Sequence, residues 1–304
     1  MRKCLVFLVI MSLLWSMTTN AFAAESDNVS YYKEEGQVNL ENLLFSVDAN
    51  NEVTAYGGSA FQRQRAENLI NNSTALQDLI QQSIIEETEP VAIGYTRMYM
   101  KKVTDESNES YYMPVTEAEY NEITRASYVK GDESEWGNLT LYVIAQDLGG
   151  TISGTVTAEW SDMVYVTAEQ MRASGRDHIG ISGPSGTVND YDGFSALCKG
   201  TSGSINLPSS RYLKTKTFEN GVAYSFYEYG GLYDEYDVLY ANIYATFAGK
   251  NNQTLTGAQK ICGAYVHTWQ DTSIDVAMGV SGIDFILSNT NNATEIGASV
   301  TIYV

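Results

Sequence analysis

The chain has 304 residues and carries 37 Asp and Glu against 18 Lys and Arg, a formal net charge of −19 at pH 7. This excess of negative charge argues against binding to nucleic acid or to anionic membranes, because both need basic patches. The 22 tyrosines favour β-strands, and the 25 glycines favour the turns between them.

The first 23 residues are expected to be a secretory signal peptide. Arg2 and Lys3 precede an apolar run from Leu5 to Trp15, and Ala21-Phe22-Ala23 fits an A-x-A cleavage site. The run is shorter than the ~20 apolar residues that a membrane span needs. We therefore expect a secreted chain, cleaved near Ala23, with no membrane span. Loss of two cations leaves 16 basic against 37 acidic residues, a net charge of about −21.

Residues 24–135 are expected to form a smaller α+β region. Its start, 24–37, is polar and acidic and is expected to be a loose N-terminus. Two short stretches, 38–47 and 52–56, favour a hairpin or a helix–strand pair. A charged, flexible stretch at 131–137 is expected to end the region.

Two helical segments are predicted within this region. Residues 59–87 contain a break after which Ser73 can cap a second helix. Apolar residues recur in that helix at helical spacing and predict a buried face: Leu76, Leu79, Ile80 and Ile84. Thr116 and Glu119 form a capping box that predicts a short helix as far as Ala126.

Residues 136–304 are expected to form an antiparallel β-sandwich, so the fold class is mainly β. Residues 151–160 alternate strictly, with Ile152, Gly154, Val156, Ala158 and Trp160 facing inward. The intervening polar residues, including Thr157 and Glu159, are predicted to face water. The final alternating run, 296–304, is expected to lie within a sheet because an exposed edge invites pairing with other chains.

Two cysteines, Cys198 and Cys262, remain after cleavage of the leader. The extracellular compartment favours a disulfide that closes a loop of about 65 residues. Burial as two separate small hydrophobic side chains is the alternative.

Catalytic signatures are missing from the sequence. It contains no G-x-S-x-G, H-E-x-x-H or C-x-x-C pattern. Of the two histidines, His178 and His267, the second alternates with aromatic residues and is expected to be packed or hydrogen-bonded. Asp190 and Asp192 lie in an oxygen-rich stretch that resembles part of a calcium loop, so Ca²⁺ is the one metal considered. An ordinary acidic turn is the alternative.

Tyrosines and carboxylates concentrate between residues 224 and 244. Tyrosine rings beside carboxylates can stack on sugars and bind their hydroxyl groups. The candidate binding residues are Tyr227, Tyr229, Tyr233, Asp234, Tyr236 and Asp237. The same pattern also fits the solvent face of an ordinary sheet, in which tyrosines pack across strands.

The hairpin over residues 139–160, which ends in Thr-Ala-Glu-Trp, and the strand-rich tail to Val304 resemble uncharacterised exported β-rich proteins of Gram-positive, spore-forming bacteria. The resemblance implies secretion and a β-rich fold. Taken together, the sequence favours a non-enzymatic binding or surface-interaction protein whose partner is a glycan or another extracellular protein. The alternatives are an extracellular glycan-active hydrolase with paired carboxylates and a self-assembling structural β-protein.

Overall fold

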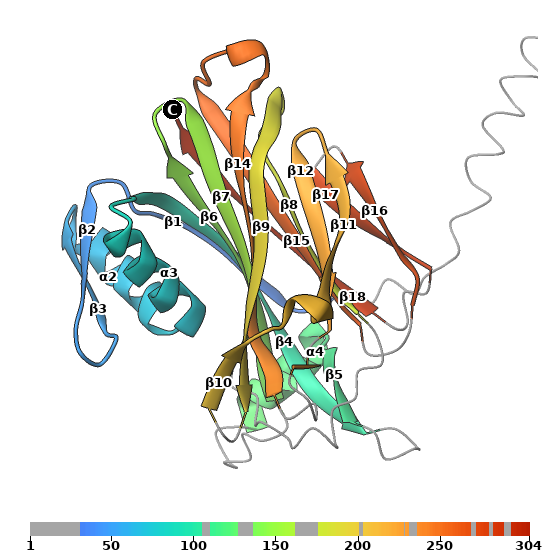
Figure 1. Ribbon diagram of the computed structural model, residues 1–304. Coiled ribbons are helices and arrows are strands. Elements are labelled where there is room, and N and C mark those ends of the chain that lie inside the picture. Colours follow the sequence, from blue (N-terminus) through green and yellow to red (C-terminus); the bar gives the residue numbers. More distant parts are fainter. Residues whose placement is uncertain are drawn as a thin grey trace, which may run out of the picture.

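The computed structural model describes residues 31–104, 110–126, 136–161, 176–200, 203–227, 229–230, 236–268, 272–279, 282–288 and 293–304. The fold is mainly β, as predicted, and consists of two antiparallel sheets packed face to face with further layers outside them (Figure 1). The predicted signal peptide lies outside the described residues. In the part of the chain that is described, no helix has the length and apolar character needed to cross a membrane.

The larger sheet contains nine strands. Their order is β1-β4-β6-β7-β14-β9-β10, with β5 beside β4 and β13 beside β14. The bounds are β1 (Lys33–Asn39), β4 (Pro90–Thr104), β5 (Ser110–Pro114), β6 (Trp136–Asp147), β7 (Thr151–Ser161), β9 (Thr187–Gly200), β10 (Gly203–Asn206), β13 (Tyr229–Gly230) and β14 (Tyr236–Gly249). Strand β1 occupies part of the stretch that was expected to be loose, so that prediction was wrong for residues 33–37.

The smaller sheet contains five strands in the order β11-β12-β8-β15-β18. The bounds are β8 (Asp177–Ser182), β11 (Tyr212–Phe218), β12 (Gly221–Phe226), β15 (Ala258–Thr268) and β18 (Ala293–Tyr303). Two short 3-10 turns, η2 (Ser209–Arg211) and η3 (Lys250–Asn252), connect strands. The register of β11 on β12 shifts between Lys214 and Lys216, which places a bulge in this outer strand.

The inner faces of the two sheets form the main core. Strand β7 contributes the alternating residues that the sequence predicted, and Val156 and Trp160 are buried among them. Across the interface, Gly154 leaves space for Ile181 and Ile261, because a Cβ there would lie 3.0 Å from each. Each large apolar side chain buried in this way contributes ~1.5–3 kcal/mol.

A helical layer covers part of the outer face of the larger sheet. It consists of the hairpin β2 (Leu43–Val47) and β3 (Val53–Gly57) with helices α2 (Ala60–Asn71) and α3 (Thr74–Ile85). Figure 1 shows this layer over β1, β4 and β6. Ser59 and Ser73 cap the two helices, the second as predicted. Leu76 and Ile80 are buried against the sheet, whereas Ile84 is exposed, contrary to the prediction.

The outward face of β7 is not solvated, so the prediction that Thr157 and Glu159 face water was wrong. Glu159 is only 4 % exposed, because the start of α3 lies on top of it. Its carboxylate accepts hydrogen bonds from Ser73 Oγ at 2.5 Å and from the Ala75 backbone N–H at 3.1 Å. A sheet residue therefore completes the cap of a helix that lies more than seventy residues earlier in the chain.

The expected boundary at 131–137 ends within the start of β6, and its residues 131–135 lie outside the described residues. Strand β4 pairs with β6 over most of its length, so the earlier and later regions share the larger sheet. Helix α4 (Glu117–Ala126) precedes β6 and opens with the predicted capping box. The Thr116 N–H donates to Glu119 Oε2 at 2.8 Å, and the Glu119 N–H donates to Thr116 Oγ1 at 3.3 Å.

Strand β18 is an edge strand, so the prediction that residues 296–304 lie within a sheet was wrong. Side chains of the larger sheet cover its outer edge instead. Gln37 Nε2 donates to the Thr301 carbonyl at 2.9 Å, and Thr96 Oγ1 donates to the Gly297 carbonyl at 2.8 Å. These contacts join the two sheets along one side of the sandwich.

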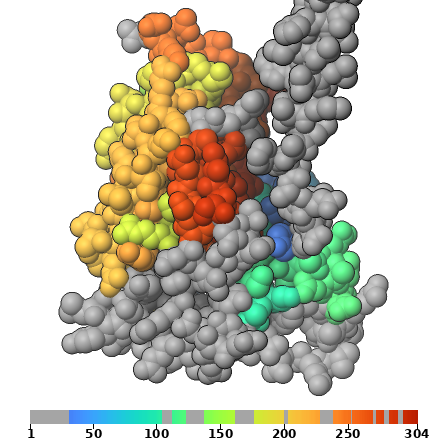
Figure 2. Space-filling view, turned by 90° about the vertical axis from the view of Figure 1, so that its right-hand side faces the viewer, coloured from blue at the N-terminus to red at the C-terminus, as the bar shows by residue number. Residues whose placement is uncertain are grey.

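A second hairpin, β16 (Ile274–Gly279) and β17 (Gly282–Leu287), lies on the outer face of the smaller sheet. Figure 2 shows it at the surface beside the strands β11 and β12. The hairpin sits close to β8, because a Cβ on Gly180 would lie 2.6 Å from Ile283 Cδ1. Lys216 and Asp275 connect β11 to the hairpin through an ion pair of 3.4 Å.

Candidate functional site

The predicted tyrosine and carboxylate residues surround the β13–β14 connection. Tyr233 and Asp234 lie outside the described residues. The backbones of Tyr229 and Asp237 pair in register, as do those of Gly230 and Tyr236. The assignment of this set as a binding face therefore stays a prediction.

Tyr227, which precedes this connection, is half-buried. The guanidinium of Arg176 lies 4.3 Å from the centre of its ring, and that of Arg211 lies 5.9 Å away. The ring thus already contacts cations of the chain itself.

The calcium prediction involves two residues in different surroundings. Asp190 lies at a register shift of β9 and is exposed. Asp192 points to the edge of the sandwich, where Lys214 Nζ lies 2.5 Å from Oδ1 and the Tyr224 hydroxyl donates to Oδ1 at 2.9 Å. Within the described ranges, no group of three or more His, Cys, Asp or Glu side chains is placed to hold a metal. Calcium binding here stays a prediction.

The predicted disulfide is absent, and this prediction was wrong. Cys198 belongs to β9 of the larger sheet, and Cys262 belongs to β15 of the smaller one. Cys198 is buried in the main core, whereas Cys262 is half-buried on the opposite, outward side of its own sheet. Both cysteines act as small packing residues, which was the alternative.

Neither histidine forms a catalytic pair with a nucleophile in the contacts of the described residues. His267 is buried as predicted, with Nδ1 3.3 Å from Asp177 Oδ2. Asp177 also accepts hydrogen bonds from the Tyr265 hydroxyl and, at 2.8 Å, from the Thr268 N–H. Burial lowers the pKa of His178 to about 4, so this ring is neutral at physiological pH.

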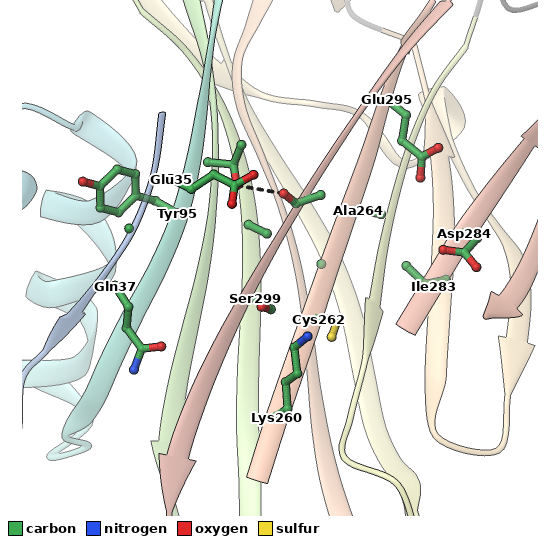
Figure 3. A pocket seen from close by; sticks show the side chains of 15 residues that line it. Glu35, Gln37, Tyr95, Lys260, Cys262, Ala264, Ile283, Asp284, Glu295 and Ser299 are labelled. Carbon is green, nitrogen blue, oxygen red and sulfur yellow. Dashed lines mark hydrogen bonds between the residues drawn. The ribbon is translucent and has the colours of Figure 1, made fainter. Parts of the chain in front are cut away.

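An open, polar crevice runs along the side of the sandwich where β1 and β4 approach β15, β17 and β18. We call this cavity of about 470 Å³ the inter-sheet crevice. Its charged lining residues are Glu35, Lys260, Asp284 and Glu295. Figure 3 shows the carboxylates of Asp284 and Glu295 together on one side of the crevice, away from Glu35.

Glu295 is flanked by charges of both signs, because Asp284 lines the same crevice and Lys33 Nζ donates to the Glu295 carbonyl at 3.4 Å. Burial raises the pKa of Glu295, and the negative charge of Asp284 raises it further, against the opposing effect of the Phe285 backbone N–H. Burial also raises the pKa of the Cys262 thiol in the same cavity. A thiol with a raised pKa is a poor nucleophile, so this residue contributes shape more than reactivity.

Small residues form the floor of the inter-sheet crevice: Gly263, Ala264, Gly297 and Ala298. Gly297 has open space above it, because the nearest atom to a Cβ placed there would be 3.7 Å away. Gln37 and Ser299 add polar groups to the walls, while the ring of Tyr95 points toward the helical layer (Figure 3). The arrangement suits a flat, hydroxylated ligand that bears positive charge.

Among the crevice residues, the sequence singled out Cys262, as half of the predicted disulfide, but none of the charged lining residues. The crevice residues come from five strands that are far apart in the chain, and each one reads locally as an ordinary strand residue. One local feature of the sequence points to the crevice. On the outward face of β18, Glu295, Gly297 and Ser299 stand where a covered face would carry large apolar side chains.

No family model matches the chain, and no curated protein matches it. Among solved structures, it is similar to the collagen-binding subdomain of the Enterococcus faecalis surface protein ACE, with 8% identity and a TM-score of 0.30 over 52% of this chain and 90% of that chain. The C-terminal domain of the Streptococcus agalactiae AgI/II polypeptide BspA matches with 7% identity and a TM-score of 0.27, over 70% of this chain and 92% of that chain. The T6 backbone pilin of serotype M6 Streptococcus pyogenes matches with 11% identity and a TM-score of 0.32, over 71% of this chain and 46% of that chain. Each likeness is partial.

Proposed function

We propose that this protein is an exported, non-enzymatic binding protein whose inter-sheet crevice holds a ligand with protonated amines and hydroxyl groups, such as a stretch of amino-sugar chain. Export is supported by the leader sequence. The observation that carries the proposal is the charge of the crevice, whose lining holds three carboxylates and one lysine, Lys260, around a space of about 470 Å³. Lys33 lies outside this lining, where it donates to the Glu295 carbonyl at 3.4 Å.

The chemistry of the walls supports a cationic ligand. An ammonium group between Asp284 and Glu295 would offset the repulsion that now raises the pKa of Glu295. Ser299 is available to pair with a hydroxyl group along the same cavity, whereas the Gln37 amide is held by the Thr301 backbone. The net negative charge of the whole chain would attract such a ligand from a distance.

Titration calorimetry with a short glucosamine oligosaccharide tests this proposal, and the N-acetylated oligosaccharide serves as a neutral counterpart of the same shape. We expect the amine form to bind and the acetylated form to bind at least tenfold more weakly. Glu295→Gln keeps an oxygen for the Phe285 N–H but removes the charge, and it should weaken binding about tenfold, as expected for a charged hydrogen bond. Glu89→Gln is the matched control, because Glu89 is exposed and lies outside the crevice. Equal binding of both oligosaccharides, or equal effects of both variants, would refute the proposal.

A glycan-active hydrolase is the second candidate function. It is favoured by one observation, the closeness of a carboxyl with a raised pKa, Glu295, to a second carboxylate, Asp284. Such a pair can supply a general acid and a base or nucleophile. Release of new reducing ends from the glucosamine oligosaccharide, lost in Glu295→Gln, would support catalysis. Binding without any release would remove this candidate.

A further inference from the structure

A second cavity, of about 400 Å³, lies between α2 and the outer face of the larger sheet. We call it the helix–sheet pocket. Helix α2 contributes Arg65 and Asn68, while β1 contributes Glu34 and β4 contributes Arg97. Because side chains alternate along a strand, Glu34 points to the opposite side of β1 from Glu35, which lines the inter-sheet crevice. The two cavities are therefore separate.

The charge of the helix–sheet pocket is opposite to that of the chain as a whole. Two guanidinium groups line it against one carboxylate, in a protein of net charge −19. That carboxylate is already engaged, because Glu34 Oε1 accepts from the Tyr99 hydroxyl at 3.2 Å and from the Tyr32 hydroxyl at 3.5 Å. Its other oxygen lies 4.0 Å from Arg97 Nη1, at the outer limit of an ion pair.

The two arginines are held differently. Arg97 is fixed in place, because its Nε donates to Thr140 Oγ1 at 3.3 Å. Arg65 is exposed, and its guanidinium has no hydrogen bond or ion pair within the part of the chain that the structure describes. The pocket thus presents one positioned guanidinium and one that is available to a ligand.

Neutral groups complete the pocket. The side-chain amide of Asn68 is exposed and can donate or accept. Asn72 Nδ2 donates to the Asn68 carbonyl at 2.7 Å, so this carbonyl at the end of α2 is already satisfied and does not have to be met by a ligand.

We infer that the helix–sheet pocket binds a ligand that carries a carboxylate next to hydroxyl groups, namely a sugar acid of the uronic-acid class. A guanidinium matches a carboxylate with two parallel hydrogen bonds, which favours arginine over lysine for this task. The amide of Asn68 can pair with the neighbouring hydroxyls. This inference does not depend on the function proposed for the inter-sheet crevice.

The test compares D-glucuronate with D-glucose on the full mature chain, by calorimetry at low salt. Arg65→Gln removes the available guanidinium and should leave the unfolding temperature unchanged, because no hydrogen bond or ion pair of Arg65 among the described residues would be lost. Lys260→Gln is the matched control, since it removes the same charge from the inter-sheet crevice. Tyr95 is avoided because it lines both cavities.

We expect glucuronate to bind and glucose not to bind. The dissociation constant for glucuronate should rise about tenfold in Arg65→Gln, the loss expected for a hydrogen bond to a charged group, and less than twofold in Lys260→Gln. The dissociation constant of Arg65→Lys for glucuronate should lie between those of Arg65→Gln and the unaltered chain, because the ammonium group keeps the charge but cannot donate two parallel hydrogen bonds. Absence of glucuronate binding, equal binding of glucose, or equal effects of Arg65→Gln and Lys260→Gln would overturn the inference.

Discussion

Replacement of Glu159 tests how the helical layer is attached to the sheet. Its buried carboxylate accepts from Ser73 Oγ and from the Ala75 N–H at the start of α3. In Glu159→Ala both donors lose their acceptor in a site that excludes water. Each unsatisfied buried donor costs ~1–3 kcal/mol. Removal of a buried charge returns part of this cost. We expect the free energy of unfolding to fall by about 3 kcal/mol.

Glu159→Gln separates the loss of the acceptors from the loss of the charge. Burial raises the pKa of Glu159 above the ordinary value of 4.5, so folding disfavours the ionised form relative to the neutral form. Glutamine is neutral and keeps one acceptor oxygen for the start of α3. We expect it to cost only about 1 kcal/mol, the net worth of one ordinary hydrogen bond.

The pH dependence of this pair has a defined sign. Because the folded chain binds the proton of Glu159 more tightly than the unfolded chain does, the contribution of this group to stability is present below pH 4.5 and is lost as the pH rises through the folded pKa. The stability of the unaltered chain relative to Glu159→Gln should therefore decrease as the pH rises across this window.

Urea unfolding followed by far-UV circular dichroism measures these differences, and amide exchange in α3 shows whether the helix is loosened locally. A double-mutant cycle with Ser73→Ala should give a coupling energy above about 0.5 kcal/mol, the usual limit of additivity for independent sites. An alanine variant as stable as the unaltered chain, a glutamine variant as unstable as the alanine variant, or strictly additive effects would refute this account of the cap.

Two further predictions concern the smaller sheet. His178→Gln should remove part of the acid sensitivity of the chain. The pKa of His178 in the folded chain, about 4, lies below the ordinary value of 6.5, so up to ~3 kcal/mol of stability present above pH 6.5 is lost as the pH falls toward 4. Urea unfolding at several pH values measures this loss, and an unchanged dependence of stability on pH in the variant would contradict the prediction. Gly180→Ala should lower the free energy of unfolding by ~1–3 kcal/mol, because the new Cβ would collide with Ile283 of the β16–β17 hairpin. Gly297→Ala should be tolerated, because the space above Gly297 is open. Thermal unfolding of both variants tests this difference, and equal effects of the two substitutions would count against it.

The sequence predicted those features of the fold that depend on local periodicity. The inward face of β7, with Val156 and Trp160, follows from strict alternation, and the cap of α3 follows from Ser73. Glu159 was misplaced because the element that covers it lies more than seventy residues away in the chain. Alternation identifies the two faces of a strand but not the number of layers around it.

The candidate sites were harder to predict for the same reason. The inter-sheet crevice brings Glu35, Lys260 and Glu295 together from strands at opposite ends of the chain. The helix–sheet pocket likewise joins Arg65 of a helix to Arg97 of a strand. No short sequence motif predicts that these residues lie close together, because each one fits the local pattern of its own strand or helix. Pairing of Cys198 with Cys262 was predicted from the compartment alone, which says nothing about the sheet to which a cysteine belongs.

Both edge strands of the smaller sheet, β11 and β18, are protected against pairing with a strand of another chain. The carbonyls at the outer side of β18 are occupied by side chains from the neighbouring sheet. At the other side, β11 combines a bulge with Lys214 and Lys216, a combination that hinders the addition of a further strand. A strand of a second copy of the chain could therefore not readily pair with either edge of the smaller sheet. Addition of a strand is therefore disfavoured at these two edges of the smaller sheet.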